Sequence, residues 1–348
     1  MPNACQADAY LTIDCGAVVR NWRRLREIHA PGAVAAVVKA DGYGLGAAPI
    51  GRALLAAGCQ HFFVAQVSEG VALRAALGDG PMIAVLGGGT GPGLTPVLNS
   101  LGDIRAHRGP AIVHIDTGMS RLGLDAAELA TLTAEPTLLD GIEILYLMTH
   151  LAVADEPEHP LNATQIARFE AACAQLPPAP RSVANSSGIF LGPRFASDLA
   201  RPGCALYGIN PTPGRPNPME PVLRMAARIL QIREIPAGQS VGYGASWTAT
   251  GVSRIATVSL GYADGFLRAL GGKAHGLLHD RTVPMAGRVS MDLLTFDVTE
   301  APEARVGDLI ALIHPSQDAD ALAAMAGTIG YEIMTALGRR FQREYLAA

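Results

Sequence analysis

The chain has 348 residues and a net charge of −4, so its length allows one large domain with a smaller one, or two domains of middling size. Apolar residues make up 49% of it, which excludes wholesale disorder. No basic cluster suggests a nucleic-acid partner, no apolar run is long enough to span a membrane, and the first residues lack a secretory pattern. These features favour a cytoplasmic protein.

Cysteine and lysine are both sparse, and both are informative. The five cysteines are Cys5, Cys15, Cys59, Cys173 and Cys204. Their scattered positions include no CxxC spacing, which predicts free thiols in a reducing compartment and no metal site. Only two of the 27 basic residues are lysines, Lys39 and Lys273. Any chemistry that needs a lysine amine therefore has two candidates.

Short apolar runs alternate with helical patterns from Ala33 to Leu206. The predicted strands are Ala33–Lys39, His61–Ala65, Met82–Leu86, Ala111–Asp116, Ile144–His150, Ser182–Ala184 and Ala200–Leu206, and the predicted helices are Pro49–Ala57, Ser68–Leu77 and Thr164–Leu176. So many alternating units favour a (β/α)₈ TIM-type barrel over an open sheet. Polar and glycine-rich segments follow the strands, and in a barrel the strand ends share one face, where we expect the chemistry.

A stiff linker follows, with five prolines in the 13 residues Ile209–Pro221. The later predicted strands are Met225–Ile235, Gln239–Thr248, Ser253–Gly261, Leu277–Val283, Leu293–Val298 and Asp308–His314, and helical signal returns only at Ala319–Met325. We therefore predict a barrel over residues 13–220 and a mainly β C-terminal domain over 221–348, joined by an N-terminal strand within 1–12.

The barrel pattern is short of chain at one point. Only Gly87–Pro110 separates two predicted strands, and this segment should hold a helix, the fourth strand and another helix. Two average helices with a strand and loops need about 30 residues or more. We expect the helix after the fourth strand, around Arg105–Pro110, to be missing or a single turn.

Lys39 is the first residue with evident chemistry. It ends an apolar strand and precedes a flexible turn and Tyr43, in AVVKADGYGLG. An amine that emerges from a hydrophobic strand is partly desolvated, which lowers its pKa and favours the neutral, imine-forming state.

Nine motifs in register cover nearly the whole chain. They are VVKADGYGLG, HIDTGMSRLG, THLAVADE, ANSSG, RPGCALYG, VGYGASW, SLGYADGF, GRVSMD and IGYEI. In this order they resemble the successive motifs of alanine racemases, which depend on pyridoxal phosphate. The resemblance implies a barrel followed by a β domain, a head-to-tail homodimer, and sites completed by the second domain of the partner.

The resemblance also implies which residues hold the cofactor. Lys39 corresponds to the Schiff-base lysine. The residues expected at the phosphate are Tyr43, Ser186 and Tyr331, with the backbone amides of Gly203 and Cys204. Arg201 matches the arginine that faces the pyridine nitrogen, and His150 matches the histidine that bonds to it. Because arginine stays protonated, the ring nitrogen beside it must accept a hydrogen bond and remain unprotonated.

Racemisation needs an acid–base group on each face of a planar intermediate. The resemblance implies that Lys39 serves the D-amino acid and that Tyr243 of the partner subunit serves the L-amino acid. A tyrosine needs a cationic neighbourhood to act as a base, which Arg121 and Arg201 could supply. Arg121 and the Met291 backbone match the groups that bind the substrate carboxylate. Tyr262, with Tyr331, matches residues that narrow the entrance and keep long side chains out.

One family feature is missing. Many members carry a carbamylated lysine seven residues before the carboxylate-binding arginine, where this chain has His114. Imidazole forms no stable carbamate, and burial beside a cation should keep it neutral. Our hypothesis is that His114 is neutral and that Arg121 is oriented by His114 directly or by a bound anion such as chloride. The alternative is that His114 is a packed strand residue facing away from Arg121.

Three other functions share parts of this pattern. A pyridoxal-phosphate decarboxylase of the same architecture would need a cysteine from the second domain as its acid, and no cysteine lies beyond Cys204. A racemase of broader specificity is excluded only weakly, because pocket width depends on loops. A non-catalytic cofactor-binding barrel would not need the second domain. We therefore expect interconversion of L-alanine and D-alanine.

Overall fold

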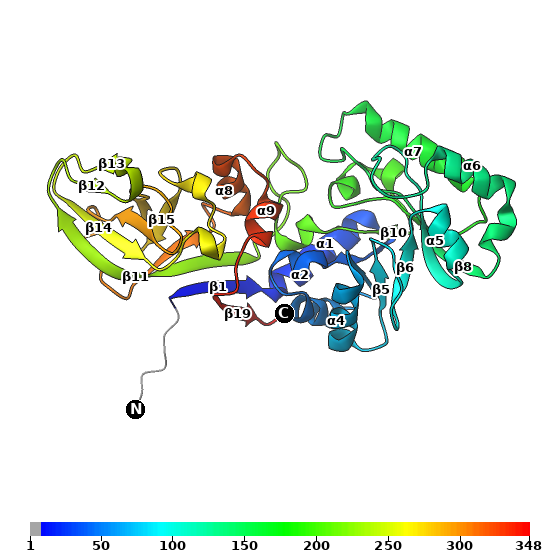
Figure 1. The fold of residues 1–348 in the computed structure, drawn as a ribbon, viewed down its shortest axis with the longest axis horizontal. Helices are drawn as coiled ribbons and strands as arrows, with labels where there is room; N and C mark the ends of the chain where they lie inside the picture. The colour runs from blue at the N-terminus through cyan, green and yellow to red at the C-terminus, as the bar shows by residue number, and fades with distance from the viewer. Residues whose placement is uncertain (1–7) are drawn as a thin grey trace. The chain divides into compact units, whose positions relative to one another are not determined.

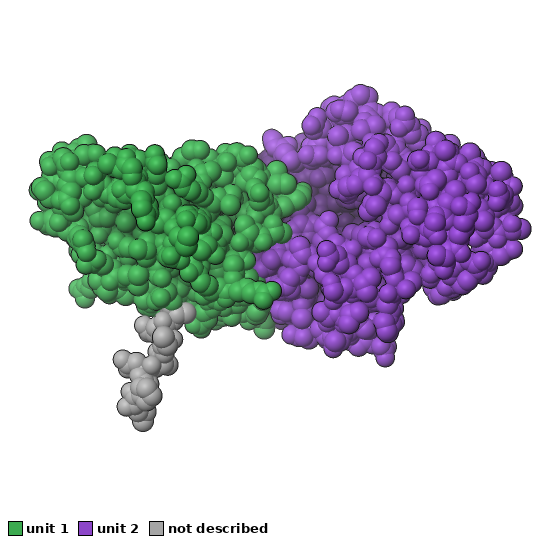
Figure 2. All heavy atoms as spheres, viewed as in Figure 1, with its two compact units in different colours: residues 1–15, 221–347 green, residues 16–220, 348 purple. Residues whose placement is uncertain are grey.

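The computed structural model describes residues 8–348, which form two compact units. Residues 16–220 make up the barrel unit, and residues 8–15 with 221–347 make up the β unit; Figure 2 colours them separately. Cys5 lies outside the described residues. The other four cysteines are buried thiols, and none of them forms a disulfide within residues 8–348, as expected.

The barrel unit is built on a parallel sheet that closes on itself. Its strands are β2 (Ala33–Val34), β3 (Ala36–Val37), β4 (His61–Val64), β5 (Met82–Val85), β6 (Thr95–Leu98), β7 (Gly109–His114), β8 (Ile142–Met148), β9 (Arg181–Ser182) and β10 (Leu199–Ala200). The sheet order runs from β2 through β10 and back down to β3. Since β2 and β3 are two parts of one chain segment, this order makes a ring, and the predicted barrel is confirmed.

Helices surround the ring. They are α1 (Cys15–His29), α3 (Ala47–Ala56), α4 (Val67–Leu77), α5 (Leu101–Ala106), α6 (Ala126–Ala134) and α7 (Pro160–Cys173). In Figure 1 the strands β5, β6 and β10 lie between α4 on one side and α7 on the other. Because all the strands are parallel, the residues that follow β3, β7, β8 and β10 come out at the same mouth of the barrel.

The segment between β5 and β7 is indeed too short for two full helices, but the prediction of which helix is missing was wrong. The helix after β6 exists as the short α5, whereas no helix lies between β5 and β6. That connection holds five glycines and one proline between Gly87 and Gly93. Gly88, Gly89 and Gly93 adopt positive φ angles, which a right-handed helix does not allow.

The described part of the β unit holds an eight-stranded sheet, a separate two-stranded sheet made of β12 and β13, and two α-helices. Its strands are β1 (Ala9–Asp14), β11 (Leu223–Ile235), β12 (Ser240–Val241), β13 (Trp247–Thr248), β14 (Ser253–Val258), β15 (His275–Leu278), β16 (Arg281–Pro284), β17 (Leu294–Asp297), β18 (Leu309–Ile313) and β19 (Gln342–Leu346). The long β11 pairs with β1 and β18 through its first half and with β14 through its second. β1 also pairs in parallel with β19.

Several predicted elements differ from the structure because turns interrupt them. Gln239–Thr248 is the hairpin of β12 and β13, which turns through Gly242 and Gly244 at positive φ. Leu277–Val283 is the hairpin of β15 and β16, with His279 and Asp280 at positive φ.

The predicted strand Ala200–Leu206 ends at Ala200, because Pro202 and Gly203 break it, and Cys204–Tyr207 forms the 3₁₀-helix η4. Helical structure also returns after α8 (Ala319–Ala326), in α9 (Gly330–Thr335), which the sequence did not predict. Within residues 8–348 no helix is both long and apolar enough to cross a membrane.

Candidate active site

Lys39 follows β3 and opens a turn of unusual backbone. Ala40, Asp41, Gly42 and Tyr43 all have φ angles between 51° and 64°, which is the left-handed region. For a residue other than glycine this conformation costs roughly 1 kcal/mol or more. Three of these four residues are not glycine and adopt this unfavourable conformation, so other contacts must hold the turn in place.

The surroundings of Lys39 favour its neutral amine. Burial is the main cause that lowers the pKa of Lys39, and the nearby charge of Arg121 lowers it further. Glu69 and Cys204 act in the opposite direction. A neutral amine is the nucleophilic form, so this position suits imine formation.

A compact cradle is formed by Tyr43, Ser186 and the start of η4. The Ser186 Oγ atom accepts the backbone N–H groups of Gly203 at 3.0 Å and Ala205 at 3.3 Å, so its own hydrogen remains free to be donated. A Cβ atom on Gly203 would lie 2.1 Å from the Tyr43 hydroxyl. The absence of a side chain at Gly203 therefore leaves room for that hydroxyl. The Tyr43 ring stacks on Tyr207 with 4.6 Å between centroids.

Arg201 is a buried cation held by neutral acceptors. Its Nη1 donates to the Ser182 hydroxyl at 2.5 Å and its Nη2 to the Thr149 carbonyl at 2.6 Å. Burial lowers the pKa of Arg201 to about 9, which still leaves it charged at neutral pH. Among the described residues no carboxylate forms an ion pair with Arg201. Its positive charge is therefore not cancelled by the protein.

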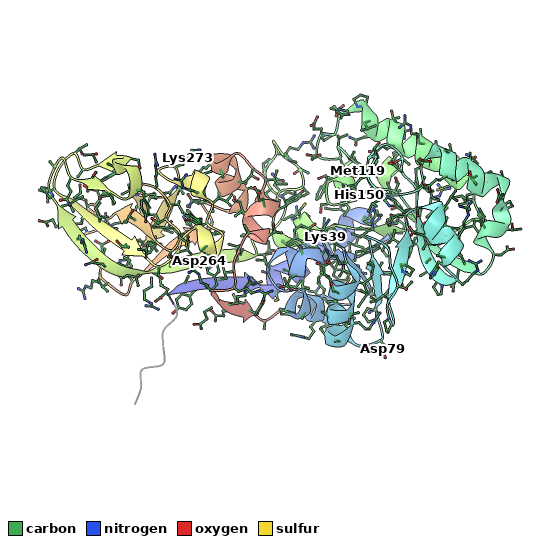
Figure 3. The ribbon with its side chains drawn as sticks, in the orientation of Figure 1. Lys39, Asp79, Met119, His150, Asp264 and Lys273 are labelled. Carbon is green, nitrogen blue, oxygen red and sulfur yellow. The ribbon has the colours of Figure 1, made fainter. Side chains whose placement is uncertain are left out.

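His150 lies where β8 ends, but its expected hydrogen bond to Arg201 is not formed. Two guanidinium nitrogens are engaged by Ser182 and Thr149, and within residues 8–348 the His150 ring makes no hydrogen bond. Burial first, and then the charge of Arg201, lower the pKa of His150 to about 3. Arg121, Lys39 and His114 also lower the pKa of His150, so these groups lie near its ring. Lys39 and His150 are labelled in Figure 3.

His114, the last residue of β7, is neutral with one defined tautomer. The Asn99 amide nitrogen donates to the carbonyls of Leu86 and Val97, so the Asn99 oxygen must be the atom 2.8 Å from Nδ1 of His114. Nδ1 therefore carries the hydrogen and Nε2 is an acceptor. Burial, and then the charge of Arg201, lower the pKa of His114 to about 4.

The segment that carries Arg121 folds back along the end of β7. Leu124 donates its N–H to the His114 carbonyl at 2.8 Å, and Asp116 donates its N–H to the Leu124 carbonyl at 3.0 Å. The Asp116 carboxylate accepts the N–H groups of Gly118, Met119 and Ser120. Burial opposes ionisation of Asp116, but these amides outweigh it and lower its pKa.

The guanidinium of Arg121 is exposed and without a partner in the part of the chain that is described. It lines an open hollow of about 530 Å³ together with Asn99, Asp103, Asp116 and Asp125. Those three carboxylates accept backbone N–H groups, so they are structural. No carboxylate of residues 8–348 holds Arg121, and the His114 ring bonds to Asn99 rather than to Arg121. The mouth of the barrel thus presents an arginine that is free to bind an anion.

The other expected site residues belong to the β unit, and all are exposed. The exposed fractions are 72% for Tyr243, 42% for Tyr262, 54% for Met291 and 37% for Tyr331. Backbone bonds bring two of these segments together, because Ala263 donates its N–H to the Met291 carbonyl at 3.0 Å. A Cβ atom on Gly261 would lie 2.2 Å from that same carbonyl oxygen, so only glycine allows this approach.

Ionic contacts brace these β-unit segments. Arg340 binds both oxygens of Asp264, at 2.6 and 2.8 Å, and also Asp292 at 2.7 Å. Asp264 in turn accepts the N–H of Gly261 at 2.9 Å. A Cβ atom on Gly244 would lie 3.1 Å from Cζ of Arg288, which places this guanidinium beside the residue that follows Tyr243.

Sequence reasoning missed the supporting residues of both units. Asn99 and Glu69 carry no motif that marks them, although Glu69 falls within the predicted helix Ser68–Leu77. Arg288 stands inside the motif GRVSMD and was not singled out, and Arg340 and Asp264 pair from distant parts of the sequence. Spacing along the chain gives no sign of such contacts.

Two family models match the chain. The model described as "Alanine racemase, N-terminal domain" covers residues 13–211, and the one described as "Alanine racemase, C-terminal domain" covers residues 222–345. Between them they span both units of the structure.

Curated proteins and solved structures agree with the family models. The chain is 53% identical to an alanine racemase of Acidiphilium cryptum, over 96% of this chain and 97% of that protein. It is 50% identical to a protein of Mesorhizobium japonicum named "Alanine racemase, catabolic", over 98% and 94%. A crystal structure of alanine racemase from Bartonella henselae with covalently bound pyridoxal phosphate superposes with a TM-score of 0.93, at 42% identity, covering 98% of this chain and all of that one.

Proposed function

Because the chain belongs to the alanine racemase family and interconverts L-alanine and D-alanine with pyridoxal phosphate, we propose that Lys39 and Tyr243 are its two acid–base residues. The observation that carries the proposal is the position of Lys39. Its amine is half-buried, has a lowered pKa and shares the barrel mouth with Arg121 and His150. Lys273, the other lysine, lies in the β unit (Figure 3).

The residues of the barrel mouth fit the cofactor. Pyridoxal phosphate brings a dianionic phosphate, and this mouth holds the cations Arg121 and Arg201 together with the amine of Lys39. Ser186 and Tyr43 offer hydroxyl groups beside the start of η4, where Gly203 leaves room. We assign the binding of the phosphate to the hydroxyl groups of Ser186, Tyr43 and Tyr331. The backbone amides of Gly203 and Cys204 would complete this phosphate site. Arg201 would hold the ring nitrogen and, as a group that can only donate, keep it unprotonated.

The chemistry divides between the cofactor and the protein. Pyridoxal phosphate, when bound, withdraws electrons from the α-carbon of the amino acid and makes its hydrogen acidic. Lys39 Nζ exchanges a proton with one face of that carbon, and the hydroxyl of Tyr243 exchanges one with the other face. Two groups are needed, because a single base tends to return the proton to the face from which it took it.

Binding of the substrate carboxylate is assigned to Arg121 and the Met291 backbone. Arg121 has no anionic partner in the described residues, so it can pair with a carboxylate without first breaking an ion pair. Tyr262, whose segment is bonded to that of Met291, would narrow the entrance with Tyr331. A narrow entrance favours the methyl side chain of alanine over longer ones.

The active form in this proposal is a head-to-tail homodimer. The four β-unit residues are exposed aromatic and apolar side chains, which are normally covered by a partner surface or a ligand. Tyr243 of the partner subunit would then meet Lys39 of this one. A racemase of broader specificity remains the alternative, since entrance loops set which side chains pass.

The experiment follows solvent deuterium into the α-position during racemisation. Wild-type enzyme should label both enantiomers of alanine, and should act on serine, lysine and arginine much more slowly. Tyr243→Phe removes one hydroxyl and no packing volume, so the variant should bind the cofactor but lose racemisation by about a hundredfold or more. Near wild-type rates in both directions would refute the role of Tyr243, and equal rates on all four amino acids would favour the broad racemase.

A further inference from the structure

The strained turn after Lys39 is tied down by a carboxylate that has no role so far. Glu69 lies in the first turn of α4, and its Oε1 accepts the N–H of Ala40 at 2.6 Å. Its Oε2 accepts the N–H of Ala65 at 2.8 Å and that of Gln66 at 3.1 Å. One side chain thus joins the residue after Lys39 to the loop after β4.

The hydrogen bond from Ala40 to Glu69 lies at the start of the strained, left-handed backbone. Ala40 is the first of the left-handed residues, with φ 52° and ψ 47°. Inside the turn, Gly44 donates its N–H to the Ala40 carbonyl at 2.7 Å, and Ala47 donates its N–H to the Asp41 carboxylate at 2.8 Å. Glu69 is the side chain that anchors the start of the turn, and the start of the turn directs Lys39.

Glu69 also acts on the Lys39 amine through its charge. The charged and titratable groups around that amine come from separate elements: Glu69 from α4, Arg121 from the segment after β7, His150 from the end of β8 and Cys204 from η4. A negative charge at Glu69 favours the protonated amine, whereas Arg121 disfavours it. Neutralising Glu69 should therefore let Lys39 lose its proton at a lower pH.

We propose that Glu69 is a positioning residue for Lys39, because it fixes the turn that aims the amine. The proposal rests on the assignment of Lys39 as the cofactor lysine. Its rival is a purely structural role, since Glu69 is also the third residue of α4 in a capping box with Gln66.

Glu128 offers a matched control for a purely structural role of Glu69. Glu128 is the third residue of α6, completes a capping box with Asp125 and accepts the N–H of Leu101 on a neighbouring element at 3.0 Å. Glu69 and Glu128 therefore do the same structural work, but only Glu69 bonds to the residue after Lys39. Glu69→Gln and Glu128→Gln should both lower Tm by a few degrees.

The discriminating measurement uses the two lysines of the chain. The full-length protein, freed of cofactor, is acetylated competitively over a range of pH, and mass spectrometry compares Lys39 with Lys273 in the same sample. Lys273, whose Nζ donates to the Met325 carbonyl at 2.9 Å in the β unit, is the internal reference. Glu69→Gln should lower the midpoint of Lys39 labelling by about half a pH unit. It should also slow covalent attachment of added pyridoxal phosphate about tenfold, and Glu128→Gln should do neither.

A second variant separates charge from geometry and covers the case in which Glu69→Gln folds poorly. Glu69→Asp keeps the charge but is too short to bridge Ala40 and Ala65, so attachment should slow while the labelling midpoint stays near that of the wild type. If the Glu69 variants leave both the midpoint and the attachment rate unchanged, and lower Tm only as Glu128→Gln does, Glu69 is a helix cap and the proposal is wrong. Cofactor attachment that persists in Lys39→Ala would instead refute the assignment of Lys39. The midpoint of Lys39 labelling, measured in the wild type and in the Glu69 variants, would still show whether Glu69 acts on the Lys39 amine.

Discussion

Acid should lower the free energy of unfolding of this protein, and part of that loss should come from protonation of His114. The variant His114→Asn should lack this part of the loss. The ring is buried, it donates from Nδ1 to Asn99, and its pKa is lowered from 6.5 to about 4. In the unfolded chain the same imidazole takes up a proton near its ordinary pKa. Between these two pKa values the unfolded state binds more protons, so the free energy of unfolding falls as the pH falls through this window.

The size of the effect follows from the two pKa values. At pH 4.5 nearly every unfolded molecule is protonated at residue 114, whereas about a quarter of the folded molecules are, which corresponds to about 2 to 3 kcal/mol lost relative to pH 7.5. Asparagine keeps a donor near the place of Nδ1 but cannot titrate. It leaves a small cavity, so the variant should be about 1 to 2 kcal/mol less stable at pH 7.5.

The assay is urea denaturation at both pH values, followed by circular dichroism at one fixed protein concentration. The wild type should lose about 2 to 3 kcal/mol more than His114→Asn between pH 7.5 and pH 4.5. His107→Asn is the control, because the His107 ring is only partly buried and contacts the Pro110 carbonyl at the surface. Equal losses in wild type and His114→Asn would show that His114 is not held neutral in the folded protein, and the tautomer argument would fail with it.

Two further predictions concern the cofactor. Lys39→Ala should abolish both the visible absorbance of covalently bound cofactor and racemisation, because the amine that forms the imine is gone. Lys273→Ala should retain both. A Lys39→Ala protein with full absorbance would refute the assignment of Lys39. Gly203→Ala should weaken cofactor binding at least about tenfold, because the new Cβ would lie 2.1 Å from the Tyr43 hydroxyl and overpacking costs roughly 1 to 3 kcal/mol. An unchanged cofactor affinity by equilibrium dialysis would show that the cradle can relax around the added methyl group.

Sequence was a good guide wherever the signal is local. The strand before Lys39 is a continuous apolar run, and the shortage of lysines leaves few alternatives, so this residue could be found from the printed sequence. The alternation of strands and helices likewise gave the barrel. The shortage of chain between β5 and β7 was visible as a length, but length does not say which helix is lost. The glycines between Gly87 and Gly93 carried that information, since they disfavour a helix before β6.

Contacts between distant segments were out of reach. Asn99 fixes the tautomer of His114 because β6 and β7 are neighbours in register, and the register is a property of the folded sheet. Glu69 meets Ala40 because α4 begins beside the end of β3. Hydrogen bonds of this kind form only when the strands and helices of the barrel have come together, and no single sequence motif predicts them.

The pairing of β1 with β19 sets an order on how the molecule can be assembled during synthesis. Tyr10 is aligned with Gln342, so during synthesis this edge of β1 is complete only after the 332 residues that follow Tyr10, up to Gln342, have been made. The barrel unit, residues 16–220, is available well before then. Until β19 has been synthesised, β1 keeps an unpaired edge that can pair with other chains. Truncation of the final strand should therefore raise the yield of aggregates more than it lowers the stability of the barrel.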